Sequence, residues 1–157
     1  GYWRDVGTID SFYEAHMDLI AIHPIFNLYN DLWPVFSESR ASIPPAKFVH
    51  AGPGRVGSAV DSIVAPGVVV SGAQISNSVV GSGAQFHSWA SVSDSVIMDG
   101  VVVGRHSQVH RAIVDKDIVI PERTQIGLDH DADRARGWTV TASGITVIGK
   151  GTVIEPA

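Results

Sequence analysis

Three histidines in the second half of the sequence, His87, His106 and His110, have side chains that could act as a general base. Imidazole exchanges a proton near neutral pH, and catalysis usually requires a second polar group that orients the ring. A 17-residue repeat, described below, places Ser93 and Gly127 beside His110 and supplies no carboxylate at that offset. We therefore expect these histidines to be structural.

A second polar group consists of Asp129, Asp131 and Asp133, which alternate as oxygen ligands do in some calcium-binding loops. Basic neighbours, among them Arg134 and Arg136, dilute the negative charge of this stretch. A solvated loop is the simpler interpretation, and we expect no calcium site there.

The composition excludes several classes of protein. The formal net charge is −5, from 11 Lys and Arg against 16 Asp and Glu, whereas a nucleic-acid-binding domain presents a basic face. The sequence has no cysteine, which excludes disulfides and thiol nucleophiles and fits a reducing compartment. No apolar run approaches the ~18 residues of a membrane-spanning helix, and no signal-peptide pattern is present. We expect a cytoplasmic protein without nucleic-acid or membrane partners.

The elements that must position these side chains are predominantly β-strands. Val and Ile together number 37, against 4 Leu. β-Branched side chains suit pleated strands and lose rotamer freedom in helices. This bias excludes a helical bundle.

Large apolar residues recur with steps of 6, 6 and 5 positions, so that three steps span 17 residues. A hexapeptide period of this kind is typical of a parallel β-helix, whose coils have three short sides and stack ~4.8 Å apart. The anchors expected to point inward are Ile63, Val69, Ile75, Val80, Phe86, Val92, Ile97, Val103, Val109, Val114, Ile120 and Ile126. The register breaks at Gly127, and a last coil resumes near Ile145.

Residues 17 positions apart are expected to stack on adjacent coils. The pairs of opposite charge at this offset are Asp94 with Arg111, Asp99 with Lys116, and Arg105 with Glu122. Each pair would contribute roughly 0.2–1 kcal/mol. The same offset predicts one column of Trp89, His106 and Arg123.

The first 46 residues differ from the repeat. Residues 8–20 are predicted to form a short helix, capped by Thr8 or Asp10, with Phe12, Ala15 (or His16) and Leu19 on its apolar face. Residues 23–46 are rich in proline and in large apolar side chains, so this connector should pack against another surface.

The segment Gly1-Tyr2-Trp3-Arg4-Asp5-Val6-Gly7-Thr8-Ile9-Asp10 closely resembles the last catalytic-domain motif of the ADP-glucose pyrophosphorylases, or glucose-1-phosphate adenylyltransferases. In that family a helix, a connector and a left-handed parallel β-helix follow, which is the order expected here. Residues 114–123 and 144–150 resemble the family's final coils, and the polar stretch between them is similar too. The resemblance covers all 157 residues and is to the bacterial, glycogen-making branch.

This resemblance implies a mainly β fold, a left-handed parallel β-helix preceded by a short helical segment. Residues 1–22 would be the tail of the nucleotidyltransferase catalytic domain, 23–46 an apolar connector and 47–157 the β-helix domain. The family's glycine-rich nucleotide loop and its first metal-binding aspartate have no counterpart in the sequence. We therefore expect a C-terminal fragment with no complete set of catalytic residues and no activity of its own.

For the intact enzyme, which converts ATP and glucose 1-phosphate to ADP-glucose and pyrophosphate, the resemblance implies a role for Asp5. It would be one of two carboxylates that hold Mg²⁺ against the nucleotide phosphates. Tyr2 and Trp3 would lie near the sugar nucleotide. Without the family, Asp5 is an ordinary loop or cap residue and the two aromatics are interface residues.

Lysine is scarce, with only Lys47, Lys116 and Lys150. The resemblance implies that Lys116 and Lys150 bind anionic regulators, sugar phosphates or nucleotides, between the β-helix and the catalytic domain, with Arg123 as a weaker addition. Taken alone, Lys116 is a surface partner of Asp99 and Lys150 a solvated corner residue. The family also implies a homotetramer, which would cover the apolar connector.

Two other functions stay open. Hexapeptide coils occur in acyltransferases that use coenzyme A and a histidine base, so the fold alone does not identify the chemistry. A non-catalytic β-helix could instead bind a partner through the unpaired edge of its last coil.

Overall fold

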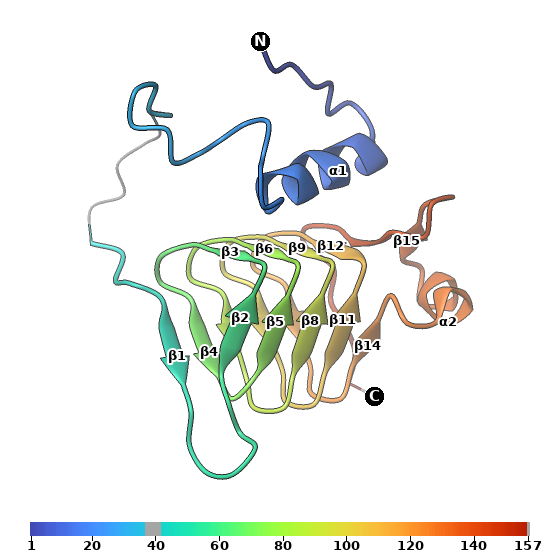
Figure 1. The fold of residues 1–157 in the computed structure, drawn as a ribbon. Helices are drawn as coiled ribbons and strands as arrows, with labels where there is room; N and C mark the ends of the chain where they lie inside the picture. The colour runs from blue at the N-terminus through green and yellow to red at the C-terminus, as the bar shows by residue number, and fades with distance from the viewer. Residues whose placement is uncertain (37–41, 157) are drawn as a thin grey trace.

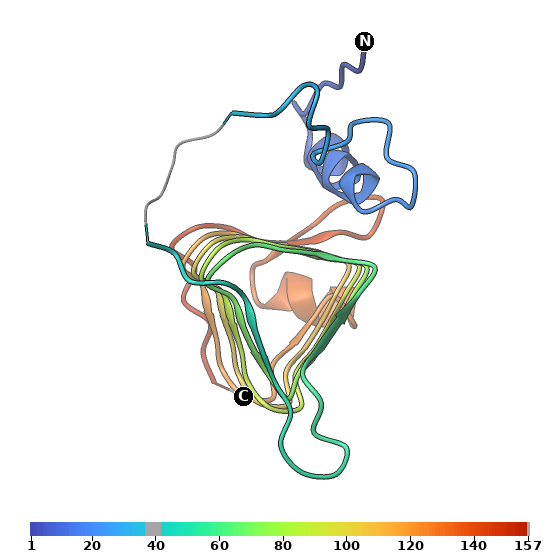
Figure 2. The same cartoon turned by 60° about the vertical axis from the view of Figure 1, so that its left-hand side comes forward.

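The computed structural model describes residues 1–36 and 42–156. It is a parallel β-helix with a triangular cross-section, beside which the helix α1 (Ile9–Leu19) and the connector lie (Figure 1, Figure 2). The mainly β fold expected from the hexapeptide period is confirmed.

Each side of the triangle is one sheet. Side 1 contains β1 (Lys47–Val49), β4 (Val69–Ser71), β7 (Gln85–Phe86), β10 (Val102–Val103) and β13 (Val119–Ile120). Side 2 contains β2 (Ser58–Val60), β5 (Gln74–Ser76), β8 (Ser91–Ser93), β11 (Gln108–His110) and β14 (Gln125–Ile126). Side 3 contains β3 (Ile63–Val64), β6 (Val79–Val80), β9 (Val96–Ile97), β12 (Ala112–Val114) and β16 (Thr146–Ile148), with β15 (Thr139–Val140) antiparallel to β16.

The interior is three columns of apolar side chains, one from each side. The inward residues are Val70, Phe86, Val103 and Ile120 on side 1, Ile75, Val92, Val109 and Ile126 on side 2, and Val80, Ile97, Val114 and Ile148 on side 3. All of them are almost completely buried. Each contributes roughly 1.5–3 kcal/mol by leaving water, so the columns supply most of the stabilisation of the domain.

The first two anchors expected from the sequence, Ile63 and Val69, are wrong by one residue. Val64 pairs with Val80, and Val70, which is fully buried, pairs with Phe86. The offset is therefore 16 residues at this point, because the corner after β4 has one residue fewer than the corner after β7. Every later anchor as far as Ile126 keeps the expected register.

A loop extends from the corner between β1 and β2, because eight residues separate these two strands. His50 and Val56 form an antiparallel bridge at its base, and the loop projects from the bottom of the β-helix in both views (Figure 1, Figure 2). The sequence repeat gave no indication of this extension.

The helix α1 begins as expected, with Thr8 as its N-cap. The Thr8 hydroxyl accepts the Ser11 N–H at 3.1 Å, and the Ser11 hydroxyl accepts the Thr8 N–H at the same distance. This reciprocal pair satisfies donors that a helix start otherwise leaves free.

Phe12, on the predicted apolar face of α1, packs against the β-helix, but the residue that α1 buries is Tyr13, which was not predicted. Tyr13 is buried against outward residues of side 3, including Val96 and Ile113, and its hydroxyl donates to the Asp94 carbonyl at 2.5 Å. Burial raises the pKa of this hydroxyl, and the Asp94 charge acts in the same direction while Arg111 opposes it. The hydroxyl therefore remains protonated and anchors α1 to the β-helix.

The polar stretch after Gly127 is not the solvated loop expected from its alternating aspartates. Residues His130–Ala135 form α2, with Asp129 as N-cap. The Asp133 side chain is buried, and its Oδ2 accepts the Gly127 N–H at 2.9 Å and the Thr146 hydroxyl at 2.7 Å. The Asp133 carboxylate thus connects Gly127, where the coil is interrupted, to Thr146, where the coil resumes.

Substituting Asp133 tests this role. Asp133→Ala is expected to lower the free energy of unfolding by about 2–4 kcal/mol, because two buried donors lose their acceptor. Asp133→Asn keeps an oxygen acceptor and should lose much less. Asp131, which is exposed, provides the control: Asp131→Ala should change stability by less than about 0.5 kcal/mol in urea denaturation. Equal losses for Asp131→Ala and Asp133→Ala would contradict the assignment.

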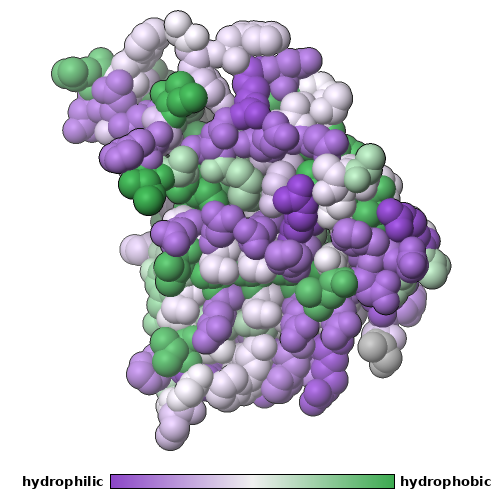
Figure 3. Space-filling model, turned by 45° about the vertical axis from the view of Figure 1, so that its right-hand side comes forward, coloured by the Kyte–Doolittle hydropathy of each residue, from purple (hydrophilic) through white to green (hydrophobic). Residues whose placement is uncertain are grey.

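The described part of the connector leaves most of its large apolar side chains exposed. The large exposed residues here and beside it are Trp3, Ile22, Ile25, Tyr29, Leu32, Trp33, Val35 and Phe36. By contrast, the face of the β-helix seen in Figure 3 is largely hydrophilic, with hydrophobic groups scattered between the polar ones. An apolar surface of this kind marks a contact with another domain or subunit. Within residues 1–36 and 42–156, neither helix is long and apolar enough to span a bilayer.

Candidate functional site

Lys116 and Lys150 lie next to each other at the corner between sides 3 and 1. Lys116 follows β12 and Lys150 follows β16, and these strands pair in parallel with Val114 opposite Ile148. The two lysines are therefore equivalent residues of adjacent coils, about 4.8 Å apart along the axis. Both side chains are exposed, so the corner presents two stacked positive charges to solvent.

Asp115 links the main chains of the two corners. Its Oδ1 accepts the Lys116 N–H at 2.7 Å, and its Oδ2 accepts the Lys150 N–H at 3.1 Å. Both carboxylate oxygens are thus directed to backbone donors on two different coils.

A depression of about 290 Å³ lies beside this corner, between α1 and side 3. Its lining consists of His16, Val79, Gly81, Val96, Ile97, Met98, Asp99 and Lys116. Lys116 belongs to both the corner and the lining of the depression, and most of the other lining residues are apolar. The depression is therefore suited to the organic body of a small ligand whose anionic group lies at the lysines.

The predicted pairs of opposite charge differ in outcome. Asp99 and Lys116 line the same depression, as the 17-residue offset requires. Arg111 is directed away from Asp94: it donates to the Ser143 carbonyl at 3.2 Å and lies over the Tyr13 ring. Arg111 thus contacts α1 instead of Asp94. A prediction from the repeat cannot anticipate this contact, because α1 lies outside the repeat.

Arg123 lies at a different corner, between sides 1 and 2. Its N–H donates to the Arg105 carbonyl at 2.8 Å, and the N–H groups of His106 and Trp89 make the equivalent bonds one and two coils below. The predicted column of Trp89, His106 and Arg123 is thus confirmed. Side 1 separates this column from Lys116 and Lys150, so the structure does not bring Arg123 together with them.

His110 has a carboxylate neighbour that the repeat did not indicate. Its Nδ1 lies 2.8 Å from the Ser93 hydroxyl, as predicted, and 3.5 Å from Asp94 Oδ2. In a nucleophile–base–acid arrangement the serine and the acid bind opposite ring nitrogens. Here both approach the same nitrogen, so this geometry does not activate Ser93. His87 and His106 lie exposed on side 1 and at its corner.

Asp5 supplies a single exposed carboxylate. Its Oδ1 accepts the Gly7 N–H at 2.9 Å, a turn geometry that an aspartate commonly adopts. Among the residues that the structure describes, no group of three or more His, Asp or Glu side chains could hold a metal ion. Because Mg²⁺ requires several oxygen ligands in octahedral geometry, the donors around Asp5 do not by themselves fit it, and a metal role for Asp5 stays a prediction.

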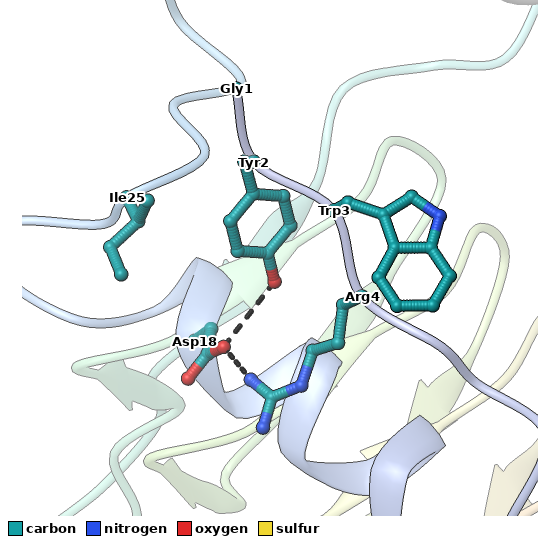
Figure 4. Close-up of a pocket in the computed structure, with 6 residues that line it drawn as sticks. All are labelled: Gly1, Tyr2, Trp3, Arg4, Asp18 and Ile25. Atoms are coloured by element: carbon teal, nitrogen blue, oxygen red, sulfur yellow. Dashed lines mark hydrogen bonds and ion pairs between the residues drawn. The ribbon is translucent and has the colours of Figure 1, made fainter.

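Tyr2 and Trp3 line an open depression of about 630 Å³ with Gly1, Arg4, Asp18 and Ile25 (Figure 4). The Tyr2 hydroxyl donates to Asp18 Oδ2 at 3.3 Å, and its ring stacks on Phe26. Arg4 forms ion pairs with Asp18 and Glu14 and so fixes this segment to α1. Trp3 is 83% exposed, so within this chain it is not a buried aromatic.

The sequence did not single out Asp115, His16 or Met98 as site residues. The spacing gave no signal for Asp115. Lys116 and Lys150 are 34 residues apart, which a 17-residue repeat would place two coils apart and not on adjacent coils. His16 and Met98 line the depression because α1 docks on side 3. The sequence repeat does not predict this docking.

Comparison with known proteins agrees with the fold and extends it. The family model described as "GlmU-like, C-terminal hexapeptide" matches residues 44–148. The chain is 54% identical over 154 residues to a glucose-1-phosphate adenylyltransferase of Bifidobacterium longum, covering 98% of the chain and 37% of that protein. It is 55% identical to the glucose-1-phosphate adenylyltransferase of Deinococcus deserti, covering 95% of the chain and 36% of that protein. It is 53% identical to that of Arthrobacter sp., covering 99% of the chain and 33% of that protein.

The chain thus spans little more than a third of the length of the curated relatives it matches. The expected resemblance to glucose-1-phosphate adenylyltransferases is confirmed for their C-terminal hexapeptide region. Since the family model matches about two thirds of the residues, the chain belongs to the GlmU-like, C-terminal hexapeptide family.

Proposed function

We propose that this chain is the regulatory and oligomerisation region of a cytoplasmic glucose-1-phosphate adenylyltransferase, and that Lys116 and Lys150 bind an anionic effector. The complete enzyme would form ADP-glucose and pyrophosphate from ATP and glucose 1-phosphate, for glycogen synthesis. The observation that carries the effector role is the stacking of the two lysines beside the depression under α1.

The two lysine side chains favour an anion between them. Two ammonium groups on adjacent coils repel each other, and like charges at such positions destabilise a sheet. A phosphate between them would neutralise both charges and accept hydrogen bonds from both side chains. The rest of a sugar phosphate or nucleotide would extend along the depression, whose wall includes His16 of α1. Binding would thus contact both the β-helix and the helix that precedes it.

The N-terminal segment supports a contact with a catalytic domain. Trp3, Ile25 and Trp33 are exposed around Tyr2, and an exposed apolar surface of this kind marks a contact with another domain or subunit. In our proposal the region that precedes this segment in the relatives covers it. Asp5 then contributes one carboxylate to a Mg²⁺ site whose other ligands lie outside this chain, and Tyr2 and Trp3 border the sugar nucleotide. Homotetramer formation would cover the remaining apolar surface of the connector.

Enzyme assays separate this proposal from its alternatives. A protein in which the region preceding this chain in the relatives is joined to it should form ADP-glucose with Mg²⁺, whereas the 157-residue chain alone should form none. An inactive longer protein would contradict the proposal. Acetyl transfer from acetyl-coenzyme A by the chain would favour an acyltransferase instead.

Phosphate binding tests the lysine corner directly. Inorganic phosphate should shift the amide NMR signals of Lys116 and Lys150 in a saturable way. Lys150→Ala is expected to weaken this binding about tenfold, because one charge-assisted hydrogen bond is lost. Lys47, in β1 at the other end of side 1, provides the control, and Lys47→Ala should leave binding unchanged. Equal effects of the two substitutions would contradict an effector site at this corner.

A further inference from the structure

Asp115 is a carboxylate in the middle of the corner that we propose binds an anion. A negative charge there repels the ligand, so electrostatics alone gives no reason for this residue. Its hydrogen bonds give one: Oδ1 bonds to the Lys116 N–H and Oδ2 to the Lys150 N–H. The same side chain thus fixes the main chain at both lysines.

The two corners belong to adjacent coils, but an insertion separates them along the chain. Residues 128–143, including α2 and β15, lie between β14 and β16. The ladder between β12 and β16 sets the register of the last coil as far as Val114 and Ile148. Beyond these residues the strands end, and the bonds from Asp115 continue the connection into the two turns.

We propose that Asp115 is a positioning residue of the effector site, which holds the two lysine corners one coil apart so that both ammonium groups reach the same anion. This inference rests on the proposed function. It predicts that loss of the Asp115 carboxylate weakens phosphate binding. Charge alone predicts the opposite, since removal of a carboxylate near a phosphate normally strengthens binding.

Two matched substitutions separate position from charge. Asp115→Asn removes one negative charge and leaves a single oxygen acceptor, so that both N–H bonds cannot be kept in their present geometry. Asp117→Asn removes the same charge from the same turn, where Asp117 is exposed. We expect Asp115→Asn to weaken binding of inorganic phosphate about fivefold, and Asp117→Asn to leave it equal or stronger. Asp115→Glu, which keeps both oxygens, should retain more binding than Asp115→Asn.

Amide hydrogen exchange gives a readout that does not depend on a ligand. The Lys116 and Lys150 amides should exchange faster in Asp115→Asn than in the unaltered chain, and at unchanged rates in Asp117→Asn. Thermal denaturation checks that each variant is folded. If Asp115→Asn and Asp117→Asn behave alike while Lys150→Ala loses phosphate binding, the role of Asp115 is wrong and the effector site stands. If the unaltered chain does not bind phosphate, both proposals are overturned.

Discussion

Gly127→Ala is expected to lower the free energy of unfolding by about 2–5 kcal/mol. Gly127 has a φ of +78°, and a Cβ atom added to it would lie 1.8 Å from the His110 carbonyl oxygen. The left-handed conformation alone costs a residue with a side chain roughly 1–2 kcal/mol. Displacing a backbone oxygen in a packed coil adds roughly 1–3 kcal/mol. The Gly127 N–H also donates to Asp133, so the displacement would disturb the buried carboxylate.

Gly137→Ala is the matched control for this prediction. Gly137 has a similar φ of +83°, but nothing lies within 4 Å of the position that its Cβ would occupy. It should therefore lose only the conformational part, about 1–2 kcal/mol. Urea denaturation of the two variants measures the difference. A loss for Gly137→Ala as large as that for Gly127→Ala would show that the close contact with His110 is not the cause.

Phe86→Ala is expected to have a comparable effect, about 3–5 kcal/mol, through a cavity in the interior of the β-helix. Phe86 is 1% exposed and lies in the side 1 column between Val70 and Val103. Each coil interior is only three side chains wide, so few neighbours can move into the space. The lost stability has two parts: the free energy gained when the ring leaves water on folding, and the contacts that its neighbours no longer make around the cavity.

The control comes from the same column. Phe48 pairs with Val70 on the first coil, at the end of side 1, and is 45% exposed. Phe48→Ala should lose about 1–2 kcal/mol, because its ring is only partly removed from water and no coil lies beyond it. Thermal denaturation followed by circular dichroism compares the two variants. Equal losses would contradict an interior in which burial increases from the first coil inward.

The β-helix was predictable because its repeat is a local property of the sequence. Each anchor from Ile75 to Ile126 is large and apolar, and each follows the previous one at a step that the coil geometry fixes. The exceptions were Ile63 and Val69, and Val69 lies in the apolar run 68–70. When three valines are consecutive, composition does not indicate which one faces inward. The length of the next corner decides it, and the buried residue is Val70.

The candidate site was only partly predictable. Lys116 and Lys150 were singled out by family resemblance, but the repeat did not predict their stacking. A separation of 34 residues corresponds to two coils, and the insertion of residues 128–143 leaves them on adjacent coils. The burial of Asp133 was not foreseen, because it depends on residues 128–143 folding back over the last coil. The role of Tyr13 was missed for a similar reason, since its partner Asp94 is 81 positions away.

The sequence by itself determined the repeat, the column positions and the break at Gly127, because stacking of identical units requires only that each residue match the one a coil below. The tertiary structure alone decided the contacts of the non-repeating parts. The helix α1 packs on side 3, Asp133 bonds to Thr146 of the last coil, and Asp115 connects the two lysine corners. These contacts join segments of unrelated pattern. They depend on the shape and the free hydrogen-bond donors of a surface that exists only once the coils have formed.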